Sequence, residues 1–175
     1  MKNLISLIAQ GKCYEPNKVE GYSEDEIYKL EKLYDINIVG NFRLFMREMG
    51  RCSGGLLGDD TFILYRDRSV RIHMINQIGF REEIANLTIN TSLELYRQYC
   101  NGAFFIVTES ETQHYYLNTK SDQPERVFHF DENTDKLEDT GYEFIDYLAD
   151  LVRRYGEDAK HYSGIICKGE LLNIV

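Results

Sequence analysis

The chain has 175 residues, 43% of them hydrophobic and 28% charged, and its 29 acidic and 20 basic residues give a formal net charge of −9. This composition excludes a disordered chain, a collagen-like chain and a disulfide scaffold, and the length favours one domain. An acidic surface repels phosphate backbones, so nucleic acid is not an expected partner, whereas a basic protein is. The charge is also compatible with a role in solubility alone.

Cysteine usage and hydropathy point to a cytoplasmic protein. The four cysteines lie far apart, at Cys13, Cys52, Cys100 and Cys167, without the spacing of a zinc site, which is typical of reduced thiols. No apolar run approaches the roughly 20 residues of a membrane helix. The apolar residues of segment 4–8 predict a short helix instead of a secretory signal.

Two helices are expected in the first 50 residues. Ser23 and Glu26 form a capping box, which predicts a helix over residues 24–34. A second helix is expected over 41–49, because apolar residues recur there at i, i+3, i+4 and i+7 and Gly50 follows. Residues 51–60 then form a glycine-rich loop.

The middle of the chain is less uniform. Residues 61–65 are β-branched and aromatic, which predicts a strand. Segment 69–87 is ambiguous, because its first part alternates like a strand and its second part, 80–87, is helical in pattern.

Three short strands and a closing helix are expected in the second half. The strands are predicted over 103–107, 113–118 and 126–130 and are separated by polar turns, which is typical of an antiparallel meander. The helix is expected to start at the Thr140–Glu143 box and to run to Tyr155. Apolar residues in the C-terminal extension, 162–175, predict that it docks on the body. The fold class is therefore α+β, a single domain with a mainly meander antiparallel sheet flanked by helices.

Motifs for cofactor chemistry are incomplete. The glycine-rich loop lacks the Gly-Lys-Ser/Thr of a phosphate-binding loop. Segment 131–142 resembles the opening of a calcium loop, but Lys136 and Tyr142 stand where glycine and glutamate are required. No cysteine has a nucleophile context. We therefore expect no metal, no cofactor and no catalytic activity, although catalytic partners that meet only in space stay open.

Acidic residues are concentrated between positions 131 and 146, where the sequence has seven carboxylates and a single basic residue, Lys136. Such a run is either a solvated loop followed by acidic residues that stabilise a helix N-terminus, or an acidic patch that binds a basic protein. For the second interpretation the candidate partner-binding residues are Asp59, Asp60, Asp131, Glu132, Asp135, Glu138 and Asp139.

The order of four sequence blocks resembles the SUKH superfamily, which includes the fungal Smi/Knr cell-wall regulators and many bacterial immunity proteins. The blocks are NFRLFMREMGRCSGG at 41–55, AFFIV at 103–107, DQPERVFHF at 122–130 and YEFIDYL at 142–148, within a core of about 23–155. Gly40 and Glu125 depart from prolines that the family often has, and Tyr99–Gly102 departs from its histidine-glutamine-glycine step.

The resemblance implies one SUKH-like domain over 1–175 without catalytic residues. It also implies a bacterial immunity protein that neutralises a cognate toxin domain, often a nuclease, by stoichiometric binding. The alternative is a regulatory scaffold that binds a cellular protein, as the fungal members suggest. The contact surface, the partner and the oligomeric state are not determined by the sequence.

Overall fold

The computed structural model describes residues 15–57, 61–67, 69–89, 92–157 and 166–172. The elements before the sheet are the 3₁₀ turn η1 (Pro16–Lys18) and the helices α2 (Glu24–Tyr34), α3 (Gly40–Met49), α4 (Ile63–Arg66), α5 (Val70–Ile89) and α6 (Leu93–Cys100). The strands are β1 (Ala103–Glu109), β2 (Gln113–Asn118), β3 (Arg126–Asp131) and β4 (Lys136–Glu143), and helix α7 (Phe144–Glu157) follows. The expected short helix at residues 4–8 lies outside the described residues.

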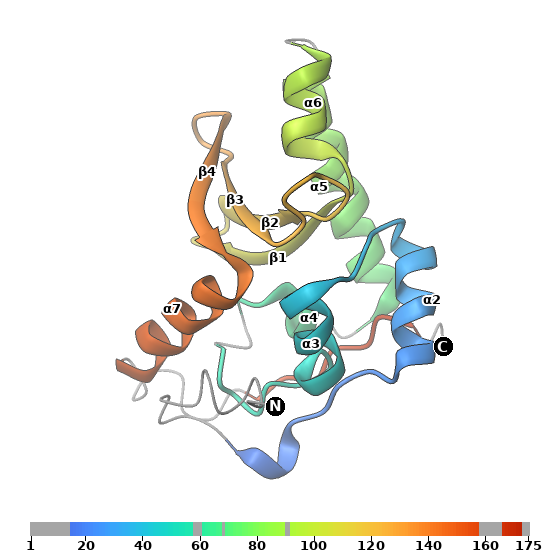
Figure 1. Cartoon of the computed structure of the whole chain (residues 1–175). Helices are drawn as coiled ribbons and strands as arrows, with labels where there is room; N and C mark the ends of the chain where they lie inside the picture. Colours follow the sequence, from blue (N-terminus) through green and yellow to red (C-terminus); the bar gives the residue numbers. More distant parts are fainter. Residues whose placement is uncertain (1–14, 58–60, 68, 90–91, 158–165, 173–175) are drawn as a thin grey trace.

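The four strands form one antiparallel sheet in the order β1-β2-β3-β4, which confirms the α+β meander. The sheet separates two apolar cores. Residues of α2, α3 and α7 pack on one face, and Phe80 and Ile84 of α5 and Cys100 of α6 pack on the other. Helix α4 contributes residues to both cores. In Figure 1, α6 continues beyond α5 at the top, and α7 leaves the end of β4 at the lower left.

Both early helices form as predicted. The Ser23 hydroxyl accepts a hydrogen bond from the Glu26 backbone N–H, and the Glu26 carboxylate accepts one from the Ser23 N–H, which completes the capping box of α2. Phe42, Phe45 and Met49 of α3 are buried. Their spacing on one side of the helix places them against the core.

Two predictions about local structure were wrong. Residues 61–65 contain one bridged position, Phe62 opposite Val107, and then the short helix α4. The β-branched and aromatic side chains of this segment are there because the segment is buried. The buried Tyr65 hydroxyl donates to the carbonyl of Met49 at 2.7 Å. The Thr140–Glu143 box belongs to β4, where Thr140 donates to the carbonyl of Val127 at 2.6 Å. The closing helix therefore begins at Phe144.

The ambiguous segment 69–87 lies in one helix, α5, whose buried face is partly polar. The Gln77 side chain donates to the Phe105 carbonyl at 2.7 Å and accepts from the Phe105 N–H at 2.9 Å. The Arg81 guanidinium donates to the Ala103 carbonyl at 2.6 Å. Because β1 is an edge strand, these side chains occupy backbone groups that a further strand would otherwise pair with.

Buried His73 lies on the same side of α5, with its ring edge-on to Tyr34 at a centroid distance of 5.2 Å. Burial, with a smaller contribution from Arg66, lowers the pKa of His73 to about 3, so the ring is neutral at physiological pH. Two polar residues of α5, His73 and Gln77, are therefore buried, which departs from the usual helix pattern.

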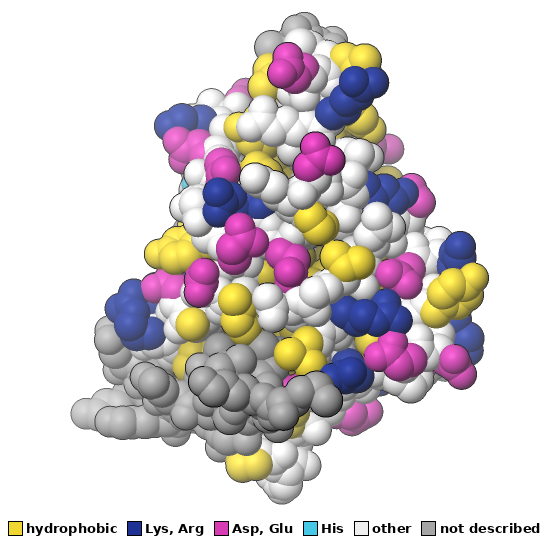
Figure 2. Space-filling view, viewed as in Figure 1, with side chains coloured by type: hydrophobic (Ala, Val, Ile, Leu, Met, Phe, Trp, Pro, Cys, Tyr) yellow, Lys and Arg dark blue, Asp and Glu magenta, His cyan; other side chains and the backbone are white. Residues whose placement is uncertain are grey.

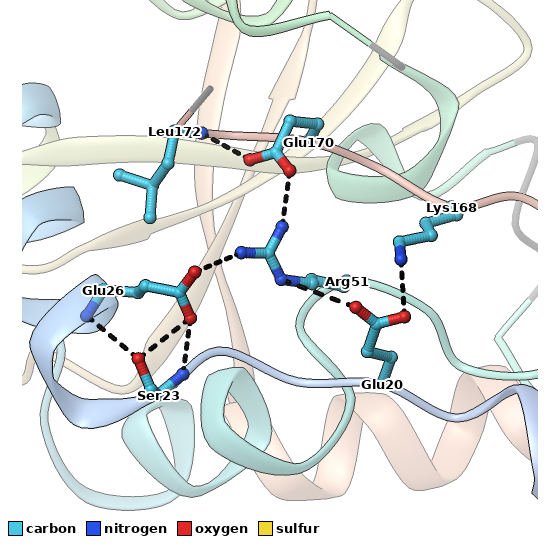
Figure 3. A network of polar contacts seen from close by, with 7 residues as sticks. All are labelled: Glu20, Ser23, Glu26, Arg51, Lys168, Glu170 and Leu172. Carbon is cyan, nitrogen blue, oxygen red and sulfur yellow. Dashed lines mark hydrogen bonds and ion pairs between the residues drawn. The ribbon is translucent and has the colours of Figure 1, made fainter. Parts of the chain in front are cut away.

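The described part of the C-terminal extension, residues 166–172, docks on the body as predicted. Leu171 is buried in the core between α2 and α3, and the Tyr34 hydroxyl donates to its carbonyl at 3.2 Å. The guanidinium of buried Arg51 lies 2.6 Å from the carboxylate of Glu170 in this segment and 2.6 Å from the carboxylate of Glu26 in α2 (Figure 3). Arg51 therefore joins this segment to α2. The glycine-rich loop, as far as residue 57, thus serves to anchor the tail.

Candidate protein-binding groove

The acidic segment predicted from the sequence is divided between two faces of the sheet. The sheet register places Glu138 opposite His129, whereas Glu132 follows β3 and contacts His114. His114 and His129 lie on opposite faces, because His114 packs on Phe130 and His129 stacks on Tyr115. The seven carboxylates of 131–146 therefore do not form one patch.

Asp131 has a structural role in the hairpin between β3 and β4. Its carboxylate accepts hydrogen bonds from the Gln113 amide at 2.8 Å, from the Thr134 hydroxyl at 2.9 Å and from the Asn133 N–H at 2.9 Å. The hydrogen bond from Gln113, followed by that from Thr134, lowers the pKa of Asp131. These contacts fix the turn and leave little of this carboxylate for a partner.

Glu138 and Asp139 are compensated by cations of this chain. Glu138 pairs with Lys136, and the Asp139 carboxylate lies 3.1 Å from Nε of Arg126. Both belong to the edge strand β4, where charged side chains oppose pairing with other strands. They line a cavity of about 340 Å³ between β4 and α7 together with Tyr115 and Arg154.

Glu132 borders an open groove of about 410 Å³ between α5 and the sheet. We name it the α5 groove. The residues of its floor and rim include Phe80, Glu83, Phe105, Glu111, His114 and Glu132. Phe80 stacks on Phe105 at a centroid distance of 4.9 Å and makes the floor apolar. The three carboxylates come from α5, from the β1–β2 turn and from the β3–β4 turn.

The rim of the α5 groove carries more negative than positive charge. Within the part of the chain that the structure describes, Glu83 and Glu111 make no ion pair, and Glu132 pairs only with His114, at 3.1 Å. Arg66 also lines the groove, but it lies 3.4 Å from Asp67. Burial, followed by the charge of Glu132, raises the pKa of Glu83, and Asp135 adds to the same effect.

The lining of the α5 groove determines which ligand it can accept. The described residues contain no group of three or more metal-ligating side chains placed to hold an ion. His114 bridges the Thr108 hydroxyl at 3.4 Å and the Glu132 carboxylate at 3.1 Å, which orients its ring within the groove. An apolar floor with an acidic rim matches a ligand that is both apolar and cationic.

Sequence reasoning found only part of this surface. It included Glu132 but missed Glu83 and Glu111, because these residues are distant in sequence and meet only through the packing of α5 on the sheet. Asp135, in the turn between β3 and β4, does not line the groove. Asp59 and Asp60 lie outside the described residues. On the face shown in Figure 2, acidic and basic side chains are interspersed, so the net charge of −9 is not gathered there.

No α-helix in the described ranges has the length and hydropathy to cross a bilayer. Comparison of the chain with protein-family models, with curated proteins and with solved structures found no match.

Proposed function

We propose that this protein is a non-catalytic binding protein whose α5 groove receives a basic segment of another protein. The observation that carries the proposal is the gathering of Glu83, Glu111 and Glu132 around an apolar floor. In the free protein burial, followed by the charge of Glu132, raises the pKa of Glu83, so the charged form of Glu83 is disfavoured there. A lysine or arginine placed between these carboxylates stabilises their charged form and supplies binding energy.

The partner that we propose is a bacterial toxin domain, in keeping with the resemblance to SUKH immunity proteins. A nuclease exposes basic side chains around its substrate-binding cleft, and an acidic groove that receives one such segment is complementary to it in charge. In this proposal the protein acts in the cytoplasm and inhibits by covering the cleft at one-to-one stoichiometry. A cellular regulatory partner would use the same groove if it carried similar basic chemistry.

The test is calorimetric titration with the toxin domain encoded next to the gene of this protein. We expect a tight complex that Glu83→Gln, Glu111→Gln and Glu132→Gln each weaken about tenfold and that depends less on salt when they are combined. Glu94→Gln is the matched control, because it removes the same charge from exposed Glu94 on α6, away from the α5 groove. Absence of a complex refutes the toxin as partner, and equal affinities of all variants refute the groove.

A further inference from the structure

The outward face of α5 carries three exposed isoleucines. Ile72, Ile75 and Ile78 have exposed fractions of 52%, 59% and 51%, although a helix normally turns such side chains inward. At about 100° per residue their spacing places them along one side of α5, and we name them the isoleucine stripe. Contiguous exposed apolar side chains of this kind mark a surface that another molecule covers.

The stripe has opposite charges at its two ends. Arg71 stands at its N-terminal end and Glu82 at its C-terminal end, and both are exposed. Neither makes an ion pair with the residues that the structure describes. Arg71 and Glu82 are equally distant along the helix from the centre of the Ile75–Ile78 pair, so the face is basic, apolar and then acidic.

Such a face is complementary to itself. If a second copy lies antiparallel to the first, a two-fold axis passes near Ile75 and Ile78, and each Arg71 faces the Glu82 of the other copy. Isoleucines then pack on isoleucines, and the opposed helix dipoles are also favourable. A uniformly basic partner, in contrast, would be repelled by Arg71.

Gly79 supports close approach of a second helix. It is exposed in the middle of α5, and a Cβ added to it would meet no atom within 4 Å. Glycine at such a position costs about 1 kcal/mol relative to alanine, and neither a positive φ nor a contact within this chain requires it. Without a side chain at this position, the backbone of a second helix can approach α5 closely.

We infer that two copies of this protein associate through an antiparallel pairing of their α5 helices along the isoleucine stripe. Two helices bury a modest area, so the dimer is a weak one. The stripe adjoins the α5 groove at Ile75 and Gly79, but Arg71, Ile78 and Glu82 do not line that groove. Variants at these three positions therefore test the dimer independently of the proposed partner.

Sedimentation equilibrium of the full chain, from about 1 µM to about 1 mM, tests the inference. We expect the average mass of the wild type to rise towards that of a dimer, and Ile78→Lys to remain monomeric. Leu93→Lys, a change at an equally exposed apolar residue of α6, is the control and should leave the dimer intact.

Charge exchange identifies the pairing itself. Arg71→Glu and Glu82→Arg should each weaken the dimer about tenfold, and the double variant should restore it because the two charges still face each other. A wild type that stays monomeric at the highest concentration overturns the inference. A double variant that is no better than the single ones, or a Leu93→Lys variant that dissociates the dimer, overturns it as well.

Discussion

Single residues of this protein show how tertiary packing sets the state of a side chain. Glu125 directly precedes β3, and its carboxylate accepts a hydrogen bond from the Phe42 N–H at 3.1 Å and so caps α3. A Cβ at residue 40 would come within 2.2 Å of the same carboxylate, and the backbone φ of Gly40 is +52°. Gly40 and Glu125 are thus in contact, and glycine at position 40 accommodates the glutamate at 125.

Glu83 gives a prediction at the same scale. Burial and the nearby carboxylates raise the pKa of Glu83 in the folded state above its value in the unfolded chain. The free energy of unfolding therefore falls as Glu83 loses its proton with rising pH. Glu83→Gln should therefore increase the free energy of unfolding at pH 7 by up to about 1 kcal/mol. The gain should disappear at low pH, where the wild-type carboxyl is protonated.

Urea unfolding of the wild type and of Glu83→Gln between pH 3 and pH 7 measures this difference. A gain that is independent of pH, or a loss of stability at pH 7, would contradict the repulsion on which the proposed function depends. Glu94→Gln, at an exposed position of α6, serves again as the control and should change stability little at any pH.

At the scale of elements, helix α5 covers the edge strand β1 and one face of the sheet. Its side chains Gln77 and Arg81 bond the backbone of β1, and its apolar residues Phe80 and Ile84 cover the sheet face. The opposite edge strand, β4, is protected by charge instead. Helix α5 buries polar His73 and Gln77 and exposes three isoleucines, so its hydropathy has no clear helical period and periodicity left this segment ambiguous.

Gln77→Leu should lower the free energy of unfolding by about 3 kcal/mol, since it leaves the N–H and the carbonyl of buried Phe105 without partners. Hydrogen exchange at the Phe105 amide should accelerate with it. The same substitution at exposed Gln98 of α6 is the control, with an expected effect below about 0.5 kcal/mol. Similar losses in the two variants would show that Gln77 does not hold β1.

Across the whole molecule, Arg51 joins segments from both ends of the chain. Its guanidinium contacts the carboxylates of Glu26 and Glu170 and lies 4.1 Å from the centre of the Tyr22 ring. Glu20 adds a contact at 3.8 Å and pairs with Lys168 at 2.6 Å (Figure 3). Residues 166–172 of the C-terminal extension are therefore part of the folded unit, held by charge as well as by burial of Leu171.

Arg51→Met should destabilise the protein by about 3 kcal/mol, because it leaves carboxylates facing one another without their cation. Urea unfolding measures the loss, and limited proteolysis should show earlier cleavage near residues 166–172. Arg47→Met is the matched control: Arg47 is half-exposed, and its distance of 3.8 Å from Glu24 predicts an effect below about 1 kcal/mol. If both variants lose the same stability, the Arg51 contacts do not anchor the tail.

The sequence by itself determined those elements whose signals are local. The capping box at Ser23, the apolar spacing of α3 and the polar turns between β1, β2 and β3 all act over a few residues, and the structure confirms them. It also determined the apolar face of α7, although not its first residue. The fold class followed from the order of these elements.

Tertiary structure decided where the charges lie. The run of carboxylates at 131–146 is continuous in sequence, but side chains alternate across a sheet, so the fold sends Glu132 to the α5 groove and Glu138 to the opposite face. Glu83 and Glu111 reach the groove only because α5 packs on β1 and β2. Local patterns report propensity and burial, whereas a binding surface depends on long-range contacts, which no short segment of the chain encodes.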